Sequence, residues 1–378
     1  MNILILNWRD PKHPRSGGAE IVTMNHAEAW VRQGNTVTWL TSGHSRAPGD
    51  EKIHGVNIVR RWGSLTVYLY APWYLVVYAR YVDVIVDEVH GIPFFSPFFT
   101  RKPVVVFIHE IAGEIWDFMY PFPLNNIGRI LESLYFKLYR HCQFWTDAPS
   151  TINELEKRGI PRVQCKAIAC PISIDKTVKQ SKRIQKERAP TYLFVSRVVR
   201  MKGIEEVIKA FSFIVKEQPD AKLWIIGGGD ARYVRQLHEM MDEYGIQKSA
   251  SFWGRVTEDK KVDLMSRAHM LLHASVKEGW GLVALEAAYV NTPSVVYNVS
   301  GLCDVVHNGR TGVVLSDNTP HEMAREALRL YFDKDRYKQY QKNGKEWVHS
   351  LKWEDVTKQS ISLLQRTITA NKHRSLSQ

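Results

Sequence analysis

The stretch "TYLFVSRVVRMKGIEEVIKAFSFIVKEQPDAKLWIIG", residues 191–227, decides the fold class of this chain. Its two apolar runs, "TYLFV" and "KLWII", are unbroken rather than alternating, which is typical of parallel strands that are buried on both faces. Between them, "GIEEVIKAFSFIVKEQ" has the pattern of a helix. A strand, a helix and a second strand in this order predict a parallel sheet with a helical crossover.

The same alternation continues in both directions from this stretch. Short apolar runs bounded by turn residues precede it as "NILIL", "TVTWL", "DVIVD", "PVVVFI" and "CKAIAC", and follow it as "ASFWG", "MLLHAS", "PSVVY" and "GVVL". At 378 residues the chain is too long for one ordinary core. We therefore expect an α/β protein of two doubly wound, Rossmann-like domains facing a central cleft. Ligands of such sheets bind beyond the carboxyl ends of the strands, which predicts a site in that cleft.

The domain boundaries follow from a basic segment between the two series of strands. Residues 176–188, "KTVKQSKRIQKER", carry six cations and one acid. We predict a first domain at 1–178, a basic linker at 179–189 and a second domain at 190–355. The net charge of +12 fits nucleic acid, an anionic bilayer or an anionic small-molecule substrate. Because no aromatic and basic RNA-binding pattern accompanies the linker, no nucleic-acid partner is expected.

The opening residues and the cysteines of the sequence favour a cytoplasmic protein. The opening "MNILIL" is too short for a signal-peptide core, and the four cysteines form no CxxC pair. They are interpreted as reduced thiols, and no metal site is predicted. The uncharged segment 65–79 has 15 residues, whereas a membrane span needs about 20. Its many aromatics and flanking arginines leave two alternatives, a core helix under the first sheet or a segment resting in a membrane interface.

Two loops have the composition of phosphate sites. Gly17 and Gly18 stand just before a predicted helix, where backbone N–H groups can approach an anion, although such a pair can also simply make a tight turn. In the second domain, Arg197, Arg200 and Lys202 lie between a strand and a helix, where they suit a diphosphate or form an ordinary charged surface.

Two glutamates of "VKEGWGLVALEAAYV", residues 276–290, suggest a sugar ligand. Glu278 and Glu286 are eight positions apart, or about 12 Å along a helix axis. Glycosidases need carboxyl groups roughly 5 to 9.5 Å apart, so a hydrolytic pair is disfavoured. We expect the two side chains to contact different parts of one elongated ligand. The alternative is a solvated loop acid and an unrelated acid on the helix surface.

These motifs together resemble a known family. "GGAE", "HE" at 109–110, "SRVVRMKG", "IIGGGD", "FWGRV", "EGWGLVALEA" and "SGLCDVVHNGRTGVVL" occur in the order of retaining glycosyltransferases of family 4, which have the GT-B fold. The opening "NWRDPKHPRSGGAE" is similar to a subgroup associated with bacterial and archaeal surface-glycan genes. Where the family often has glycine, "VNTPSVV" has Asn291, which suits a left-handed turn. Where it often has a proline-asparagine-glycine turn, "CPISID" leaves the hinge between the domains open.

The resemblance implies a role for each candidate residue of the second domain. Arg197 and Lys202 match the pair that binds the diphosphate of a nucleotide sugar, Glu278 matches an acid set against the donor sugar, and Glu286 matches an acid that holds the ribose. The backbone of Trp280, Gly281 and Leu282 caps the sugar or the diphosphate, and the base lies near Gly229, Arg255 and Val256.

From the first domain, the resemblance implies contacts to the same donor. His109 matches a histidine near the donor sugar, with a structural strand-end histidine as the alternative, and Gly17 and Gly18 match a backbone contact. The catalytic residues are then predicted to be Glu278, His109, Arg197 and Lys202. A helix at about 356–370 resembles the C-terminal helix that, in this fold, crosses back onto the first domain.

The function implied is that of a retaining, metal-independent hexosyltransferase without a cofactor. The donor is a UDP-sugar or GDP-sugar, and the acceptor is a glycan or a lipid-linked molecule in surface polysaccharide or glycolipid synthesis. Aromatics at 62–82 and 94–99, with the positive charge, favour peripheral attachment to an anionic membrane surface on the inner face of the cell membrane. The alternatives are a nucleotide-sugar epimerase of the same fold and a catalytically silent, membrane-associated nucleotide-sugar-binding protein.

Overall fold

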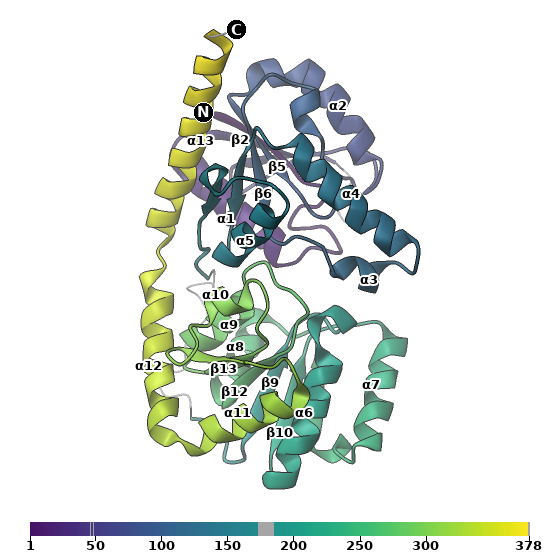
Figure 1. The fold of residues 1–378 in the computed structure, drawn as a ribbon, viewed down its shortest axis with the longest axis vertical. Helices are drawn as coiled ribbons and strands as arrows, with labels where there is room; N and C mark the ends of the chain where they lie inside the picture. The colour runs from purple at the N-terminus through teal and green to yellow at the C-terminus, as the bar shows by residue number, and fades with distance from the viewer. Residues whose placement is uncertain (46, 48, 173–184, 377–378) are drawn as a thin grey trace. The chain divides into compact units, whose positions relative to one another are not determined.

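The computed structural model describes residues 1–45, 47, 49–172 and 185–376 (Figure 1). The chain forms two compact units, one of residues 1–170 with 352–378 and one of residues 171–351. Residues 173–184 lie outside the described part, so the predicted boundary at 178 and most of the predicted linker at 179–189 fall there. Both units are Rossmann-like α/β folds with largely parallel sheets, which confirms the predicted fold class.

The first unit is built on an eight-stranded sheet of order β3-β4-β2-β1-β5-β6-β7-β8. Every neighbouring pair is parallel except β3 with β4. The strands are β1 (Asn2–Leu6), β2 (Thr36–Thr41), β3 (Glu51–Ile53), β4 (Val56–Arg60), β5 (Val84–Glu88), β6 (Val104–Ile108), β7 (Gln143–Thr146) and β8 (Cys165–Ala167). In register, Ile5 of the central β1 faces Trp39 on one side and Val86 on the other, so unbroken apolar runs fill the middle of the sheet.

Helices cover both faces of this sheet. They are α1 (Gly18–Arg32), α2 (Val67–Tyr78), η1 (Ala79–Tyr81), η2 (Ser96–Phe98), α3 (Ile115–Met119), α4 (Leu124–Leu138), α5 (Pro149–Lys157), η3 (Arg162–Gln164) and α13 (Trp353–Leu376). Helices α2 and α4 share one hydrophobic core with β1, β5 and β6. The C-terminal helix α13 contacts α1, β5 and β6, and the buried Trp30 Nε1 donates to Ser360 Oγ at 3.0 Å (Figure 1). The end of the chain is therefore a structural part of the first unit.

The second unit has a six-stranded, all-parallel sheet of order β11-β10-β9-β12-β13-β14. The strands are β9 (Thr191–Val195), β10 (Lys222–Ile226), β11 (Ala250–Gly254), β12 (Met270–His273), β13 (Ser294–Val296) and β14 (Gly312–Val314). The helices are η4 (Arg200–Lys202), α6 (Ile204–Glu217), α7 (Ala231–Glu243), η5 (Gln247–Ser249), α8 (Glu258–Arg267), α9 (Leu282–Tyr289), α10 (Leu302–Val305), α11 (Pro320–Phe332) and α12 (Lys334–Ser350).

Two turns of the second unit require special backbone conformations. Gly203, which precedes α6, has φ +70°, and a Cβ there would lie 1.9 Å from the carbonyl oxygen of Ala274. Only glycine allows that close approach. Asn291 has φ +57°, which confirms the left-handed turn predicted for "VNTPSVV".

The uncharged segment at 65–79 has two different faces. In α2, Val67, Ala71 and Leu75 are buried in the core of the first unit, whereas Leu69 is 72% and Val76 is 71% exposed. The buried face is that of a core helix, and the membrane-interface alternative for the exposed face stays a prediction. Among the described residues, no helix is long and apolar enough to cross a membrane.

We expect the contact of α13 with the first unit to carry a large share of that unit's stability. Leu364 in α13 is fully buried, so Leu364→Ala should lower the free energy of unfolding by about 2 to 5 kcal/mol through the lost burial and the cavity left behind. Urea denaturation measures the effect. The neighbouring, exposed Gln365→Ala is the matched control, and equal stability of the two variants would contradict the contact.

Candidate active site

The loops after β9, β10 and β11 of the second unit pack tightly against one another. The N–H of Gly227 donates to the carbonyl of Gly254 at 2.8 Å. A Cβ at Gly227 would lie 1.7 Å from the carbonyl oxygen of Ser196, and one at Gly229 would lie 2.6 Å from that of Val198. Glycine is therefore needed in "WIIGGGD" so that three loops can meet at the carboxyl end of the sheet.

Lys202 and Glu278, predicted for different parts of one donor, form an ion pair. Lys202 Nζ lies 2.8 Å from Glu278 Oε1, and His273 Nε2 lies 2.9 Å from the same oxygen. Burial opposes ionisation of Glu278, but Lys202 and His273 outweigh it and hold its pKa well below the ordinary value. Glu278 is therefore a fixed carboxylate at the end of β12.

Glu286 has a separate cationic partner. Lys261 Nζ of α8 lies 3.0 Å from Glu286 Oε2 and 2.8 Å from Glu258 Oε2. Burial raises the pKa of Glu286, and Lys261 only partly offsets that rise. The two glutamates are thus held by different cations, in keeping with separate roles along one ligand.

His273 and Lys261 were not identified from the sequence. His273 ends the run "MLLHAS", and a polar residue at the carboxyl end of a buried strand was a usable signal. Lys261 lies in a charged helix with nothing to distinguish it from its neighbours. Only the packing of α8 against α9 brings it to Glu286.

Two further predicted cations are exposed on the same loops. Arg197 follows β9 and Arg255 follows β11, and the described residues include no ion-pair partner for either. A Cβ at Gly228 would lie 2.6 Å from Arg255 Nε, so the guanidinium group rests on the glycine turn. Val256 is half-buried beside it. This edge of the sheet therefore offers two guanidinium groups to an anion.

The predicted caps stand at the start of α9. Gly281 has φ +84° and is the N-cap of α9, which begins at Leu282. Trp280 is buried just before it. A Cβ at Gly301 would lie 2.4 Å from the carbonyl oxygen of Glu278, so the loop that carries Glu278 is pressed against the turn before α10. The backbone at the N-terminus of α9 is thereby fixed in place.

In the first unit, buried titratable groups gather at the carboxyl ends of β5, β6 and β7. His109 Nδ1 lies 2.5 Å from Asp147 Oδ2, and the His90 ring stacks on the His109 ring with centroids 5.5 Å apart. Burial opposes protonation of His109, but the carboxylates of Asp147 and Glu88 outweigh it and raise its pKa to about 9. The His109 side chain is therefore an imidazolium at neutral pH.

The pKa values of Glu88 and His90 are both shifted so that the uncharged form of each side chain is favoured. Burial raises the pKa of Glu88 to about 7, although Thr23 and Asn7 donate hydrogen bonds to its carboxylate. Burial lowers the pKa of His90 to about 3. Because ligand atoms of Glu88, His90 and His109 lie within 4.8 Å of one another, these three residues could hold a metal ion. That grouping was not predicted from the sequence.

The predicted glycine contact lies at the start of α1. The N–H of Gly17 donates to Glu20 Oε2 at 2.7 Å, and Glu20 Oε1 pairs with an Arg9 guanidinium nitrogen at 2.7 Å. Gly18 is the first residue of α1. Glu20 is fully buried and thus ties the "NWRD" loop to the helix. The Gly17 N–H is engaged by Glu20 in this structure.

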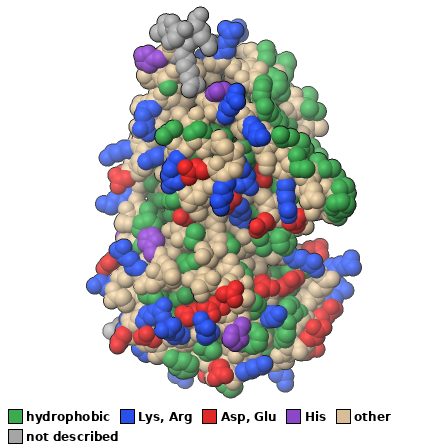
Figure 2. All heavy atoms as spheres, in the orientation of Figure 1, with side chains coloured by type: hydrophobic (Ala, Val, Ile, Leu, Met, Phe, Trp, Pro, Cys, Tyr) green, Lys and Arg blue, Asp and Glu red, His purple; other side chains and the backbone are tan. Residues whose placement is uncertain are grey.

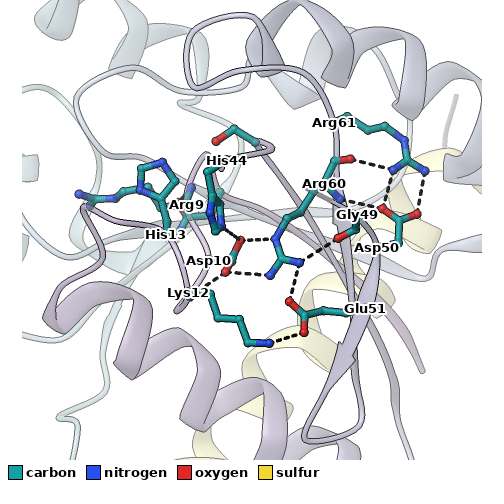
Figure 3. Close-up of polar contacts among 12 residues, drawn as sticks. Arg9, Asp10, Lys12, His13, His44, Gly49, Asp50, Glu51, Arg60 and Arg61 are labelled. Atoms are coloured by element: carbon teal, nitrogen blue, oxygen red, sulfur yellow. Dashed lines mark hydrogen bonds and ion pairs between the residues drawn. The ribbon is translucent and has the colours of Figure 1, made fainter. Parts of the chain in front are cut away.

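Figure 3 shows how the rest of the "NWRD" motif is held. Arg60 Nε donates to Asp10 Oδ2 at 2.8 Å and a terminal nitrogen donates to Asp10 Oδ1 at 3.1 Å, so the pair is bidentate. Both side chains are fully buried. His44 Nε2 lies 3.3 Å from Asp10 Oδ2. Asp10 therefore fixes the loop between β1 and α1, a structural role within a motif noted for its family resemblance.

We expect Asp147→Asn to lower the pKa of His109 well below about 9, because burial would then act against the imidazolium with one fewer opposing carboxylate. Since the folded-state pKa is raised, the stabilisation is fully present below about pH 6.5 and is lost as pH rises through about 9. Nitrogen NMR of labelled histidine measures the titration, with the exposed Asp355→Asn as control. Wild-type titration near the ordinary value would contradict the assignment.

Two family descriptions together match most of the chain. The family described as "Glycosyltransferase Family 4" matches residues 16–176, and the one described as "Glycosyl transferases group 1" matches residues 175–347. An uncharacterized glycosyltransferase of Methanocaldococcus jannaschii is 26% identical over 96% of this chain and 97% of its own length. A GDP-mannose-dependent phosphatidylinositol monomannoside mannosyltransferase of Mycobacterium tuberculosis is 28% identical over 44% of this chain and 45% of its own length.

Solved structures with the same fold include two with high coverage. Sucrose-phosphate synthase of Thermosynechococcus elongatus matches with a TM-score of 0.78 and 19% identity, over 98% of this chain and 99% of that one. The Anabaena protein HepE, in complex with UDP and glucose, matches with a TM-score of 0.75 and 16% identity, over 97% of this chain and 100% of that one. This chain is therefore a glycosyltransferase of the GT-B type, with a family 4 domain followed by a group 1 domain.

Proposed function

We propose that the protein is a retaining hexosyltransferase that moves a sugar from UDP-sugar or GDP-sugar to a glycan or lipid-linked acceptor. The observation that carries this proposal is the fixed Glu278 carboxylate, which is held by Lys202 and His273. The exposed Arg197 follows the neighbouring strand β9. A relative is named as using GDP-mannose, and a structural neighbour is described in complex with UDP-glucose. We place the reaction in surface polysaccharide or glycolipid assembly, where a lipid-linked acceptor fits a peripheral position on the inner face of the membrane.

Donor binding is assigned to the second unit. Arg197 binds the diphosphate, which it can hold through two oxygens with its planar guanidinium group. Lys202 has three N–H donors, of which Glu278 occupies one, so the others can donate to a phosphate oxygen. The backbone of Trp280, Gly281 and Leu282 caps the ligand at the N-terminus of α9.

The remaining donor contacts are to the ribose and the base. Glu286 accepts from the ribose hydroxyls, and the nearby Lys261 ammonium favours its charged form. The base lies beside Gly229, Arg255 and Val256, on the loops after β10 and β11. In the first unit, the backbone contact to an anion is assigned to Gly18 at the start of α1, because the Gly17 N–H is engaged by Glu20.

The chemistry consists of stabilising the leaving group and positioning the sugar. The acceptor hydroxyl oxygen forms a bond to the anomeric carbon, the bond from that carbon to the phosphate oxygen breaks, and the acceptor proton passes to the leaving phosphate. Arg197 and Lys202 stabilise the negative charge that develops on the diphosphate, so no metal ion is required there. Glu278 of the second unit binds hydroxyls of the sugar and orients it. In the first unit, the His109 imidazolium is a donor for a hydroxyl oxygen.

Two other functions would give different results with purified protein. A nucleotide-sugar epimerase would convert the donor with no acceptor present. A catalytically silent protein would bind the donor without turnover for any acceptor. The carboxylate at Glu278, charged and fixed by two partners, favours a transferase over a silent protein.

We expect Lys202→Ala and Glu278→Ala each to lower the rate of sugar transfer by about a hundredfold or more, because a preorganised charge at the reacting centre is lost. Mass spectrometry of reactions with UDP-glucose, GDP-mannose and a panel of acceptors measures product formation. Lys209→Ala, an exposed lysine of α6, is the matched control and should keep full activity. Activity indifferent to both site variants would overturn the assignment.

Chelation tests the metal independence of the reaction. With Arg197 and Lys202 as the diphosphate partners, EDTA should leave the transfer rate unchanged. A loss of activity that a divalent cation restores would contradict this mechanism. If the His90→Ala variant no longer depends on the divalent cation, the ion would be assigned to the group of Glu88, His90 and His109.

A further inference from the structure

Helix α4 carries apolar side chains on its outer side as well as on its inner side. Tyr135 and Phe136 are buried in the core of the first unit. On the outside, aliphatic side chains recur at spacings of three and four residues and are between 47% and 60% exposed: Leu124, Ile127, Ile130, Leu131, Leu134 and Leu138. Such spacing places them on one stripe of the helix. A soluble surface helix would carry polar residues there.

The stripe continues into neighbouring elements of the same unit. Before α4, Phe118, Met119, Tyr120 and Phe122 are exposed, and α2 and the loop before it add Trp62, Leu65, Leu69, Trp73 and Val76. Figure 2 shows hydrophobic side chains gathered along the right-hand edge of this unit, over α2 and α4. We call these exposed side chains of residues 62–76 and 118–138, together with the exposed Phe98 and Phe99, the apolar face. A contiguous surface of this kind marks an interaction site.

A basic cavity lies at one end of the apolar face. Its volume is about 930 Å³, and its lining includes five basic side chains and no acidic one: Arg101, Lys102, His141, Lys166 and Arg366. Within the described part of the chain, none of its arginines and lysines is paired with a carboxylate. Four uncompensated Arg and Lys side chains around one cavity attract an anion.

The apolar face and the basic cavity are continuous. Pro97 and Thr100 line the cavity, and between them Phe98 is 59% and Phe99 is 37% exposed. Helix α4 ends at Leu138 on the apolar face, and His141, three residues later, lines the cavity. An apolar surface rich in aromatics with a cationic site at its rim complements the hydrocarbon and the phosphates of an anionic bilayer.

We propose that the apolar face docks on a lipid bilayer and that the basic cavity binds the phosphate of an anionic lipid head group. The proposal deepens the proposed function and rests on it only for the lipid-linked nature of the acceptor. Aliphatic and aromatic side chains enter the acyl boundary, while Arg101, Lys102 and Arg366 stay at the level of the head groups. A second copy of the chain would offer the same apolar face but not the negative charge that the cavity requires.

Flotation of the full chain with vesicles tests both parts. Wild-type protein should bind vesicles of phosphatidylcholine with phosphatidylglycerol at low salt more strongly than vesicles of phosphatidylcholine alone. The exposed substitutions Ile130→Glu and Leu134→Glu together should lower binding to both kinds of vesicle by roughly tenfold or more. Phe332→Glu in α11, where the side chain is 62% exposed, is the matched control and should bind like wild type.

The cavity is tested separately. The double variant Arg101→Ser with Arg366→Ser should lower the preference for phosphatidylglycerol vesicles roughly tenfold. Its binding to vesicles of phosphatidylcholine alone should be unchanged. Lys338→Ser with Lys342→Ser, on exposed positions of α12, supplies the control of equal charge. An unchanged lipid preference in the cavity variant would overturn the head-group site.

Two further measurements separate this inference from the proposed function. Transfer to a soluble acceptor without vesicles should be unaffected by Ile130→Glu with Leu134→Glu. If wild type transfers sugar but does not float with vesicles, the docking proposal fails and the proposed function stands. If wild type floats with vesicles but transfers no sugar, the docking proposal stands and the proposed function fails. Dimerisation that Leu134→Glu abolishes, with no vesicle binding, would assign the apolar face to a second copy and overturn the proposal.

Discussion

Parallel pairing is the constraint on which the structure depends, because it brings the carboxyl ends of neighbouring strands to one edge of each sheet. In the second unit, this edge gathers the loops that carry Arg197, Arg255 and Glu278. In the first unit, the adjacent β5, β6 and β7 bring Glu88, His109 and Asp147 together, although Glu88 and Asp147 lie far apart in the sequence. The candidate site residues of each unit therefore lie at one edge of its sheet, while the rest of the sheet serves as core.

Some of the charges gathered at these edges are buried or nearly so, and three of them illustrate how such a group is paired. Asp10 meets Arg60, Glu278 meets Lys202, and His109 meets Asp147. Breaking a pair of this kind by removing one partner typically costs about 3 to 5 kcal/mol, since an uncompensated charge stays buried. The partners thus fix the position and the protonation state of the groups that the proposed reaction uses, before any ligand arrives.

The helices of the two units differ in the side chains that they expose to solvent. Helix α6 of the second unit has one apolar face, which is buried in its core. Helices α2 and α4 of the first unit have a buried face and an apolar outer face, so their exposed side is not explained by folding of the unit alone. The proposed docking on a bilayer gives these exposed apolar side chains a binding partner. It would also bring the first unit to the membrane surface, where a lipid-linked acceptor is found.

By itself, the sequence determined the local structure. Unbroken apolar runs predicted the buried parallel strands, helical spacing predicted the crossovers, and Asn291 marked a left-handed turn, because each of these patterns depends on residues close together in the chain. It also pointed to Glu278 and Lys202, which follow predicted strands, and to Glu286, which lies in the helix after Glu278. The roles implied for them stay predictions.

Only the tertiary structure decided which groups meet. Lys202 and Glu278 are 76 residues apart and form one ion pair, His273 joins them, and Lys261 reaches Glu286 from another helix. No local pattern specifies such contacts, since they arise from the order of strands in the sheet and from the packing of helices on it. Likewise, the apolar residues of α4 point in two directions, and hydrophobicity alone cannot tell the side that packs on a sheet from the side that is left exposed.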